Sequence, residues 1–348
     1  MSATEGQRFL KKGTRMFLSI GDEQSNSGDA QLIELVNATL PWTLVHTFPD
    51  ESSCHALIEY QGNIYAGTED RNNDRGNIKV STNDGVSFTL EHTIDHFTDW
   101  VSAFGIFGGE LFAGERFGEP FGEIHGRTAG GTWTVRHTVT RGALIELMNF
   151  KEFSGFLYAG YRANSTDGIG AEILRTNNGT TWTTAFQFPS DRTDLGDIEV
   201  FQGKLYASLY NDTLTDIEVW ESSDGTTWTV NHTFTDTVTR FPKQMATDGT
   251  NLFLGTISIS STTVHPIYVY DGTSWSLSVD VRNDLGITNS RIINALGYDP
   301  DNDKVYACAS QVIGSGSEIA IIVCPTADSG TPGGGGIGGG GGGGGGGE

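Results

Sequence analysis

The sequence predicts an all-β fold, a seven-bladed β-propeller in which each blade is a four-stranded antiparallel sheet. An aromatic residue followed by small residues recurs along the chain, and a second aromatic residue follows most copies about half a repeat later. The two series run in phase, with separations of 45 to 53 residues. A period of this length fits one four-stranded sheet with its turns. One such sheet cannot bury both of its faces alone, so the copies are expected to stack radially.

The first series marks seven copies of the repeat, and the second series marks six. The first comprises Phe17, Tyr65, Phe112, Tyr158, Tyr206, Phe253 and Tyr306. The second comprises Trp42, Phe88, Trp133, Trp182, Trp228 and Trp275. Turn pairs precede several members of the second series, as in Asn178-Gly179 and Asp224-Gly225, and such pairs tolerate the positive φ angles of tight hairpins.

Each copy is expected to contain four short strands, which in the second copy are residues 55–60, 63–68, 77–81 and 87–93. Residues 143–153 have strong helix formers, so propensity alone favours a helix there. Their place in the repeat is that of a first strand, and we therefore predict a strand.

The closure of the ring is less well defined, because the last copy has three candidate strands and no tryptophan strand. Either the last blade is short, or residues 7–12 add to it as an outer strand and leave the first blade without its inner strand. A six-bladed ring is the alternative, and it would leave residues 16–36 surplus.

The turn segments resemble the Asp-box of sialidase-like (BNR) propellers in a shortened form, and Ser222-Ser-Asp224-Gly225-Thr-Thr-Trp228 is the best copy. The resemblance implies the propeller fold. In that family the box lies on the face opposite the catalytic centre, so the match implies folding rather than chemistry.

Composition excludes several classes of function. Asp and Glu number 43 against 21 Lys and Arg, a net charge of -22, which opposes generic binding to nucleic acid or anionic lipid. Residues 1–12 lack the apolar segment of a secretory signal, and residues 319–324 are far shorter than the ~20 residues of a membrane span. Cys54, Cys308 and Cys324 are widely spaced, so we expect no disulfide framework, metal site or cofactor.

Candidate ligand contacts lie where first strands begin. Trp100, Arg141, Arg240 and Arg291 fall at or just before the first strands of four blades. The three arginines resemble the triad that holds a carboxylate in sialidases, although the family's Arg-Ile-Pro motif is absent here. The alternative is that they offset acidic neighbours such as Asp99 and Asp194.

A second group of candidates lies between the second and third strands, where the copies differ most. Phe117, Phe121, Tyr161 and Arg162 are the proposed binding residues there, with ordinary loop packing as the alternative. His46, His92, His137 and His232 each follow a landmark aromatic residue by four positions. A residue repeated in this way is expected to serve packing rather than catalysis.

These observations lead to one domain, residues 1–331, followed by a flexible glycine-rich tail, residues 332–348. The hypothesis is a non-enzymatic adhesion module on a phage tail or capsid surface, which presents loops to a host-surface glycan or protein. The alternatives are a sialidase-like exo-glycoside hydrolase and a structural subunit that contacts other virion subunits. We expect a virion or extracellular location with a cytoplasmic one left open, no catalytic residues, no nucleic-acid or membrane partner, and possible oligomers.

Overall fold

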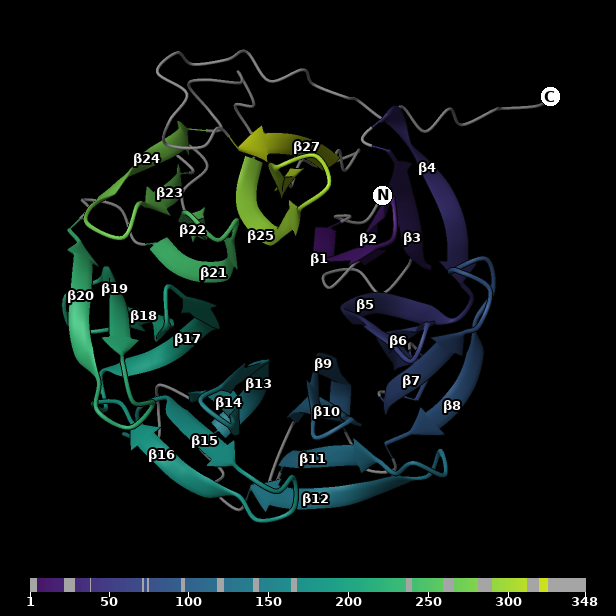
Figure 1. Cartoon of the computed structure of the whole chain (residues 1–348), viewed down its shortest axis with the longest axis horizontal. Helices are drawn as coiled ribbons and strands as arrows, with labels where there is room; N and C mark the ends of the chain where they lie inside the picture. Colours follow the sequence, from purple (N-terminus) through teal and green to yellow (C-terminus); the bar gives the residue numbers. More distant parts are fainter. Residues whose placement is uncertain are drawn as a thin grey trace.

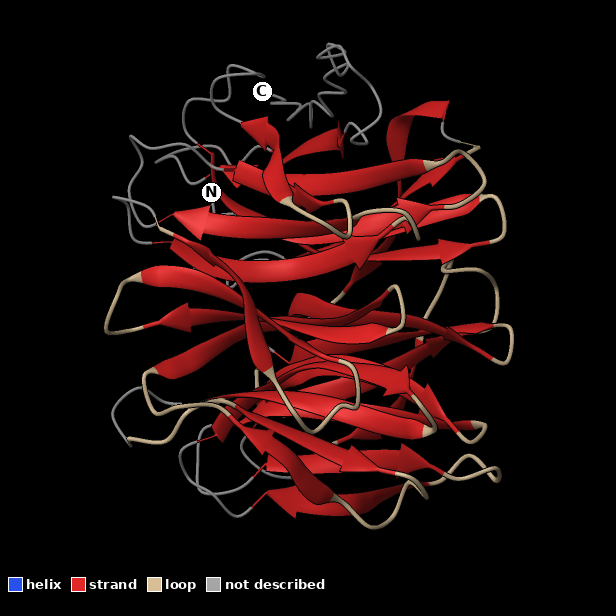
Figure 2. Ribbon diagram, turned by 60° about the vertical axis from the view of Figure 1, so that its left-hand side comes forward, coloured by secondary structure: helices blue, strands red, loops and turns tan. Residues whose placement is uncertain are grey.

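The computed structural model describes residues 5–21, 29–37, 39–70, 72–73, 75–94, 98–117, 122–139, 144–163, 168–235, 240–258, 266–280, 290–311 and 319–324. Within these ranges the regular structure is β-strand and contains no α-helix, which confirms the all-β prediction (Figure 2). Accordingly, no described helix is long and apolar enough to cross a bilayer. The glycine-rich tail and the domain boundary at residue 331 lie outside the described residues.

The strands pair in chain order into antiparallel sets of up to four, which we call sheets; a backbone pairing of Arg116 with Glu146 and another of Ile257 with Ile292 each join two neighbouring sheets. The first three sheets are β1 (Glu5–Lys12), β2 (Arg15–Gly21), β3 (Ala30–Val36) and β4 (Thr39–Phe48); β5 (Glu51–Tyr60), β6 (Asn63–Asp70), β7 (Arg75–Ser81) and β8 (Thr89–Thr93); and β9 (Thr98–Phe107), β10 (Glu110–Phe117), β11 (Gly122–Arg127) and β12 (Trp133–Val139). The next two are β13 (Leu144–Phe153), β14 (Phe156–Ala163), β15 (Glu172–Thr176) and β16 (Thr183–Gln187); and β17 (Arg192–Phe201), β18 (Lys204–Asn211), β19 (Asp216–Ser222) and β20 (Thr229–Phe234). The last are β21 (Arg240–Thr247), β22 (Leu252–Ser258), β23 (Pro266–Tyr270) and β24 (Trp275–Asp280), and the shorter β25 (Ser290–Asp299), β26 (Lys304–Gln311) and β27 (Ile319–Cys324).

The sheets stand around a central opening, and the first strand of each sheet lies nearest to it (Figure 1). Each first strand contacts the next one around the opening, and β25 contacts β1. The segment with high helix propensity forms β13, as its place in the repeat predicted. Tertiary pairing with β14 along its whole length therefore outweighs local propensity.

Neighbouring sheets pack through the first aromatic series and the hairpin turns. The turn glycines Gly179 and Gly225 have φ angles of 73°, which favour glycine. Each also lies against the landmark ring of the preceding sheet, since a Cβ on Gly179 would stand 2.8 Å from Phe112 and a Cβ on Gly225 would meet the Tyr158 hydroxyl. The two aromatic series keep the same period because the turn of one sheet sits on the ring of the sheet before it.

The repeated histidines form a second set of contacts between sheets. His92 stacks on Trp133 with ring centroids 6.0 Å apart and an interplanar angle of 15°. His137 and Trp182 lie 6.3 Å apart, as do His232 and Trp275, while His46 lies 5.1 Å from Phe88. Burial lowers the pKa of all four imidazoles. The packing role expected for these residues agrees with these contacts.

The ring closes by packing and ion pairs rather than by an exchanged strand. β1 pairs with β2 as the inner strand of the first sheet, so residues 7–12 do not complete the last sheet. Phe9 of β1 lies against Gly297 of β25, where a Cβ would be 2.4 Å from the Phe9 side chain. Lys11 forms ion pairs with Asp299 and with Asp301, the latter at 3.0 Å. The sequence had left open a short last sheet or a last sheet completed by residues 7–12. In the described residues the last sheet is short.

We expect Gly179→Ala to destabilise the fold by about 2–5 kcal/mol, as the sum of a left-handed backbone cost and a clash with Phe112. Gly155→Ala is the matched control, because Gly155 has a φ of 78° but open space around the added Cβ. Only the backbone cost of about 1–2 kcal/mol applies to that variant. Urea unfolding measures both values, and equal losses in the two variants would contradict the proposed contact between turn and ring.

The four histidines predict acid sensitivity. Because their pKa values are lowered in the folded state, the unfolded chain binds protons more readily, and the free energy of unfolding falls as the pH drops below about 6.5. Replacing all four by glutamine should flatten this dependence in urea unfolding between about pH 7 and about pH 5. An unchanged slope would assign the acid sensitivity to other groups.

Candidate functional site

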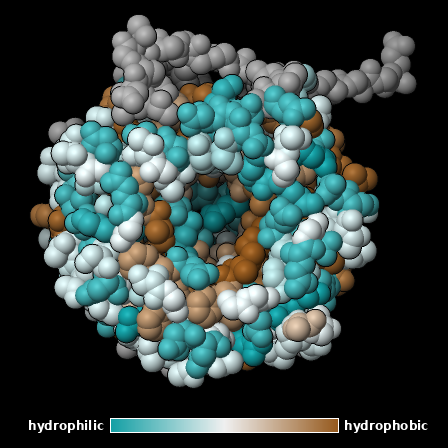
Figure 3. All heavy atoms as spheres, in the orientation of Figure 1, coloured by the Kyte–Doolittle hydropathy of each residue, from teal (hydrophilic) through white to brown (hydrophobic). Residues whose placement is uncertain are grey.

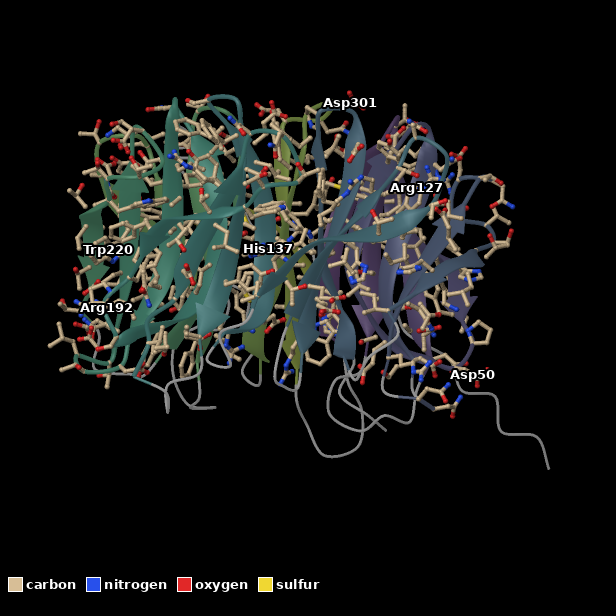
Figure 4. All side chains as sticks on the ribbon, turned by 90° about the horizontal axis from the view of Figure 1, so that it is seen from below. Asp50, Arg127, His137, Arg192, Trp220 and Asp301 are labelled. Atoms are coloured by element: carbon tan, nitrogen blue, oxygen red, sulfur yellow. The ribbon has the colours of Figure 1, made fainter. Side chains whose placement is uncertain are left out.

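The two ends of the central opening differ in the kind of loop that they carry. Hairpin turns such as the one with Asp301 lie at one end, and the connections between sheets, such as the one with Asp50, lie at the other (Figure 4). We call these the hairpin end and the connection end. Viewed as in Figure 1, the centre of the ring is hollowed, with hydrophilic residues in its depth (Figure 3).

Near the connection end lies a set of side chains from first strands and from the ends of second strands. We call this set the mouth belt: His55, Trp100, Arg116, Glu146, Arg162, Asp194, Tyr210 and Phe241. It runs through neighbouring sheets, from β5 to β21. The positions recur because each sheet presents the same part of the repeat to the opening.

One part of the mouth belt is a stack of rings and a guanidinium. His55 stacks on Trp100 with centroids 4.2 Å apart and an angle of 15°, and the Arg116 Cζ lies 4.3 Å from the centre of the Trp100 ring. Trp100 is only 8% exposed. The indole therefore orients Arg116 through a cation–π contact, and little of its surface is left to contact a ligand directly.

The middle of the mouth belt is ionic. The Arg162 Nε lies 2.9 Å from Asp194 Oδ1, and its Nη1 lies 3.5 Å from Glu146 Oε2. Arg116 is the backbone pairing partner of Glu146, so β10 and β13 meet at this point. Two guanidinium groups and two carboxylates give the ionic part a formal charge of zero.

The far side of the mouth belt is aromatic. Tyr210 at the end of β18 lies 4.4 Å, centroid to centroid, from Phe241 of β21. Tyr210 is buried, whereas Phe241 is partly exposed. The belt thus combines planar polar groups with aromatic rings, a composition that small-molecule sites share.

Along the channel, the first strands carry a ring of irregularities, to which the belt residue His55 also belongs. Their pairing with the second strands is shifted at equivalent positions, namely Gln7, His55, Ser102, Met148, Gly196, Lys243 with Gln244, and Asn294. Such bulges re-aim neighbouring side chains. Here they direct polar groups to the next sheet, as when the Ser102 hydroxyl donates to the Leu147 carbonyl oxygen at 2.6 Å.

Three polar residues at this depth form what we call the channel cluster: Arg8, Asn149 and Asp197. Arg8 Nη2 donates to Asn149 Oδ1 at 3.2 Å, and Asn149 Nδ2 donates to Asp197 Oδ1 at 2.7 Å. The backbone N–H of Met245 donates to Asp197 Oδ2 at 2.8 Å. Burial raises the pKa of Asp197 to about 6, although the positive charges of Arg8 and Lys151 act in the opposite direction. Burial of an ionisable carboxyl group costs stability, and such groups occur often at functional sites, so Asp197 is a candidate functional residue.

The structure divides the sequence-predicted residues into three groups. Trp100 and Arg162 lie in the mouth belt. Tyr161 is fully buried, and burial raises its pKa well above its ordinary value, so its assignment to a binding surface was wrong. Arg240, Arg291 and Phe117 lie in strands whose backbone alone is described, and Arg141 and Phe121 lie outside the described residues, so the arginine triad stays a prediction.

The sequence reasoning missed Arg8, Arg116, Asn149 and Asp197. Arg116 could have been found, because it follows Phe112 by four residues, as Arg162 follows Tyr158. Asn149 and Asp197 are separated by 48 residues, one repeat. Arg8 meets Asn149 from 141 residues away, and no local pattern indicates that contact.

The described residues offer no cluster of His, Cys, Asp and Glu side chains that could hold a metal ion. Cys54, Cys308 and Cys324 are buried free thiols. Burial raises the pKa of Cys54 and of Cys324 to about 12, so neither is a nucleophile near neutral pH.

No protein-family model and no curated protein matches the chain. Several solved structures, in contrast, are similar to this chain in fold. The periplasmic gluconolactonase of Pseudomonas aeruginosa superposes with a TM-score of 0.65 at 11% identity, covering 93% of this chain and 94% of that one. An oligogalacturonate lyase from Vibrio parahaemolyticus gives 0.59 at 10% identity, with coverage of 92% and 89%. A protein from Lactobacillus plantarum gives 0.65 at 11% identity, with coverage of 89% and 92%.

These likenesses confirm the β-propeller fold, and at such low identity they show the fold alone. They also contradict the hypothesis of a non-enzymatic adhesion or structural module on a virion, because two of these full-length matches are enzymes. Function has to be derived from the residues around the channel.

The raised pKa of Asp197 gives a test of the channel cluster. The folded state holds this proton more readily than the unfolded chain, so the ionised group costs stability as the pH rises toward and through about 6. Relative to the wild type, Asp197→Asn should therefore gain about 1–3 kcal/mol between about pH 4.5 and about pH 7.5. Urea unfolding measures the gain, and a variant that runs parallel to the wild type across this range would contradict a raised pKa.

Proposed function

We propose that this propeller is an enzyme that hydrolyses a small neutral sugar lactone at the connection end of its channel. The observation that carries the proposal is the mouth belt, in which two guanidinium groups, two carboxylates and aromatic rings from neighbouring sheets lie together near the connection end. Hydroxyl groups both donate and accept hydrogen bonds, and the belt offers both kinds of partner.

Charge favours a neutral ligand over an anionic one. Arg162 is already engaged by Glu146 and Asp194, so the ionic part of the belt has no net positive charge to offer a carboxylate. The whole chain carries a charge of -22, which repels anions as they approach. At the mouth belt, a sialic acid or an oligogalacturonate meets both obstacles, whereas a neutral lactone meets neither.

The proposed chemistry uses a water molecule and a carboxylate. The water oxygen bonds to the lactone carbonyl carbon while the Asp194 carboxylate, whose side chain is 22% exposed, accepts the proton. The ring C–O bond then breaks, and the departing alkoxide takes that proton back. The product is a hydroxy acid, and Asp194 ends in its original state.

The solved structures support the substrate class by analogy. The protein from P. aeruginosa is named a gluconolactonase, and its fold matches this chain over nearly the full length of both. Since the likeness concerns the fold, the choice of a lactone rests on the neutrality of the mouth belt.

Two finer features of the fold belong to the same proposal. We propose that the ring counts seven blades, with β25–β27 as a short seventh, because the first strands follow one another around the opening. We also propose that the hairpin turns are shortened Asp-boxes. In the best copy, the Gly225 N–H donates to Ser222 Oγ at 2.8 Å, and the N–H groups of Thr226 and Thr227 donate to Asp224 Oδ1.

The full chain should hydrolyse D-glucono-δ-lactone faster than the spontaneous reaction, as measured by proton release in a weak buffer. Arg162→Gln should lower kcat/KM by about 10- to 100-fold, since a charged hydrogen bond contributes about 1.5–3 kcal/mol. Arg136→Gln is the control, because Arg136 pairs with Glu110 within the third sheet and lies outside the mouth belt.

No turnover above the spontaneous rate with a panel of neutral aldonolactones would overturn the proposal. Turnover of oligogalacturonate, seen as an unsaturated product, would replace it with an elimination on an anionic substrate. Release of a fluorophore from a sialoside would replace it with the glycosidase alternative.

A further inference from the structure

Arg8 reaches across the centre of the ring. β1 and β13 lie on different sides of the opening (Figure 1), and the Arg8 guanidinium joins them through its hydrogen bond to Asn149. Asn149 is held in turn by Asp197 and by the Phe150 N–H, which donates to the same Asn149 Oδ1 at 2.9 Å. The guanidinium is therefore tied across the channel by one hydrogen bond to Asn149, a side chain that Asp197 of a third sheet holds in place.

Most N–H donors of Arg8 have no partner among the described residues. A guanidinium carries five N–H groups, and the hydrogen bond to Asn149 uses one of them. Arg8 lies within 4.0 Å of no described carboxylate, whereas Arg15, Arg127, Arg136, Arg162 and Arg192 all form ion pairs. The positive charge of Arg8 acts on the buried Asp197 carboxyl group, and most of its N–H groups are left for a further acceptor.

The depth of Arg8 suits a ligand held by the mouth belt. Its partner Asn149 follows the belt residue Glu146 by three positions on β13, which corresponds to about 10 Å along an extended strand. A monosaccharide lactone that contacts the belt can direct its carbonyl oxygen into the channel toward this guanidinium.

We infer that Arg8 is the oxyanion-binding group of the channel, whose remaining N–H groups take the lactone carbonyl oxygen as it becomes negative and then the carboxylate of the product. This inference rests on the proposed lactone hydrolysis. Donors held in place before reaction stabilise developing charge without reorganising, and this is often the largest single contribution to catalysis. Product release is aided by the repulsion between the anionic product and the acidic protein.

Arg8→Gln should lower kcat for the lactone by about 10²–10³-fold, the usual effect of removing one oxyanion donor, with a smaller change in KM. Arg8→Lys, which keeps the charge, should retain more activity than Arg8→Gln. Arg15→Gln is the matched control in the same sheet, because Arg15 pairs with Glu34 on the outer side and should leave kcat unchanged.

Two further measurements separate binding chemistry from a structural role. Guanidinium ion added at low concentration should restore part of the activity of Arg8→Ala, which a merely structural arginine would not allow. Titration calorimetry with D-gluconate should show binding by the wild type and about tenfold or greater weakening in Arg8→Gln, for loss of a charged hydrogen bond.

The outcomes are distinguishable. An inactive wild type that binds gluconate through Arg8 would overturn the proposed function and retain Arg8 as an anion-binding group. An active wild type with unchanged kcat in Arg8→Gln, or with no rescue of Arg8→Ala and unchanged gluconate affinity, would overturn the inference about Arg8 and leave the proposed function standing.

Discussion

The structure depends on the contact between neighbouring sheets. A four-stranded sheet has two faces and can bury neither alone, so each sheet is stable only between two others. The contact joins a landmark ring in one sheet to the hairpin turn of the next, as Tyr158 meets Gly225. The same contact is repeated at one spacing, and in this chain the sheets curve into a ring in which the last meets the first.

The same constraint produces the candidate site. A ring places the first strands of all sheets around one axis, so side chains from distant parts of the sequence converge there. Bulges in these strands direct polar groups such as Asn149 and Asp197 to the neighbouring sheet. The channel cluster therefore connects first strands of different sheets through hydrogen bonds. It also holds Arg8 where a ligand that enters from the connection end would meet it.

The sequence predicted the parts of this structure that repeat. Residues 143–153 were assigned to a strand from their place in the repeat, against their helix propensity, and the described part, Leu144–Phe153, forms β13. Ring closure and the contact between Arg8 and Asn149 were not predictable, because they join residues far apart without any periodic pattern. Tyr161 and Arg162, neighbours in β14, show that sequence reasoning did not tell which of two adjacent side chains reaches the candidate site. Successive side chains point to opposite faces, so Arg162 reaches the mouth belt while Tyr161 is buried between sheets.

The function was the part that the fold left open, since propellers serve as enzymes and as binding modules alike. The central claim is that a neutral sugar lactone is held between the mouth belt and Arg8. A crystal structure of the full chain with a lactam analogue of gluconolactone, which resists hydrolysis, tests it most directly. The claim predicts an analogue at the connection end, its ring against the belt and its carbonyl oxygen within hydrogen-bond distance of the Arg8 guanidinium. An analogue bound at the hairpin end, or against the outer strands, would contradict it.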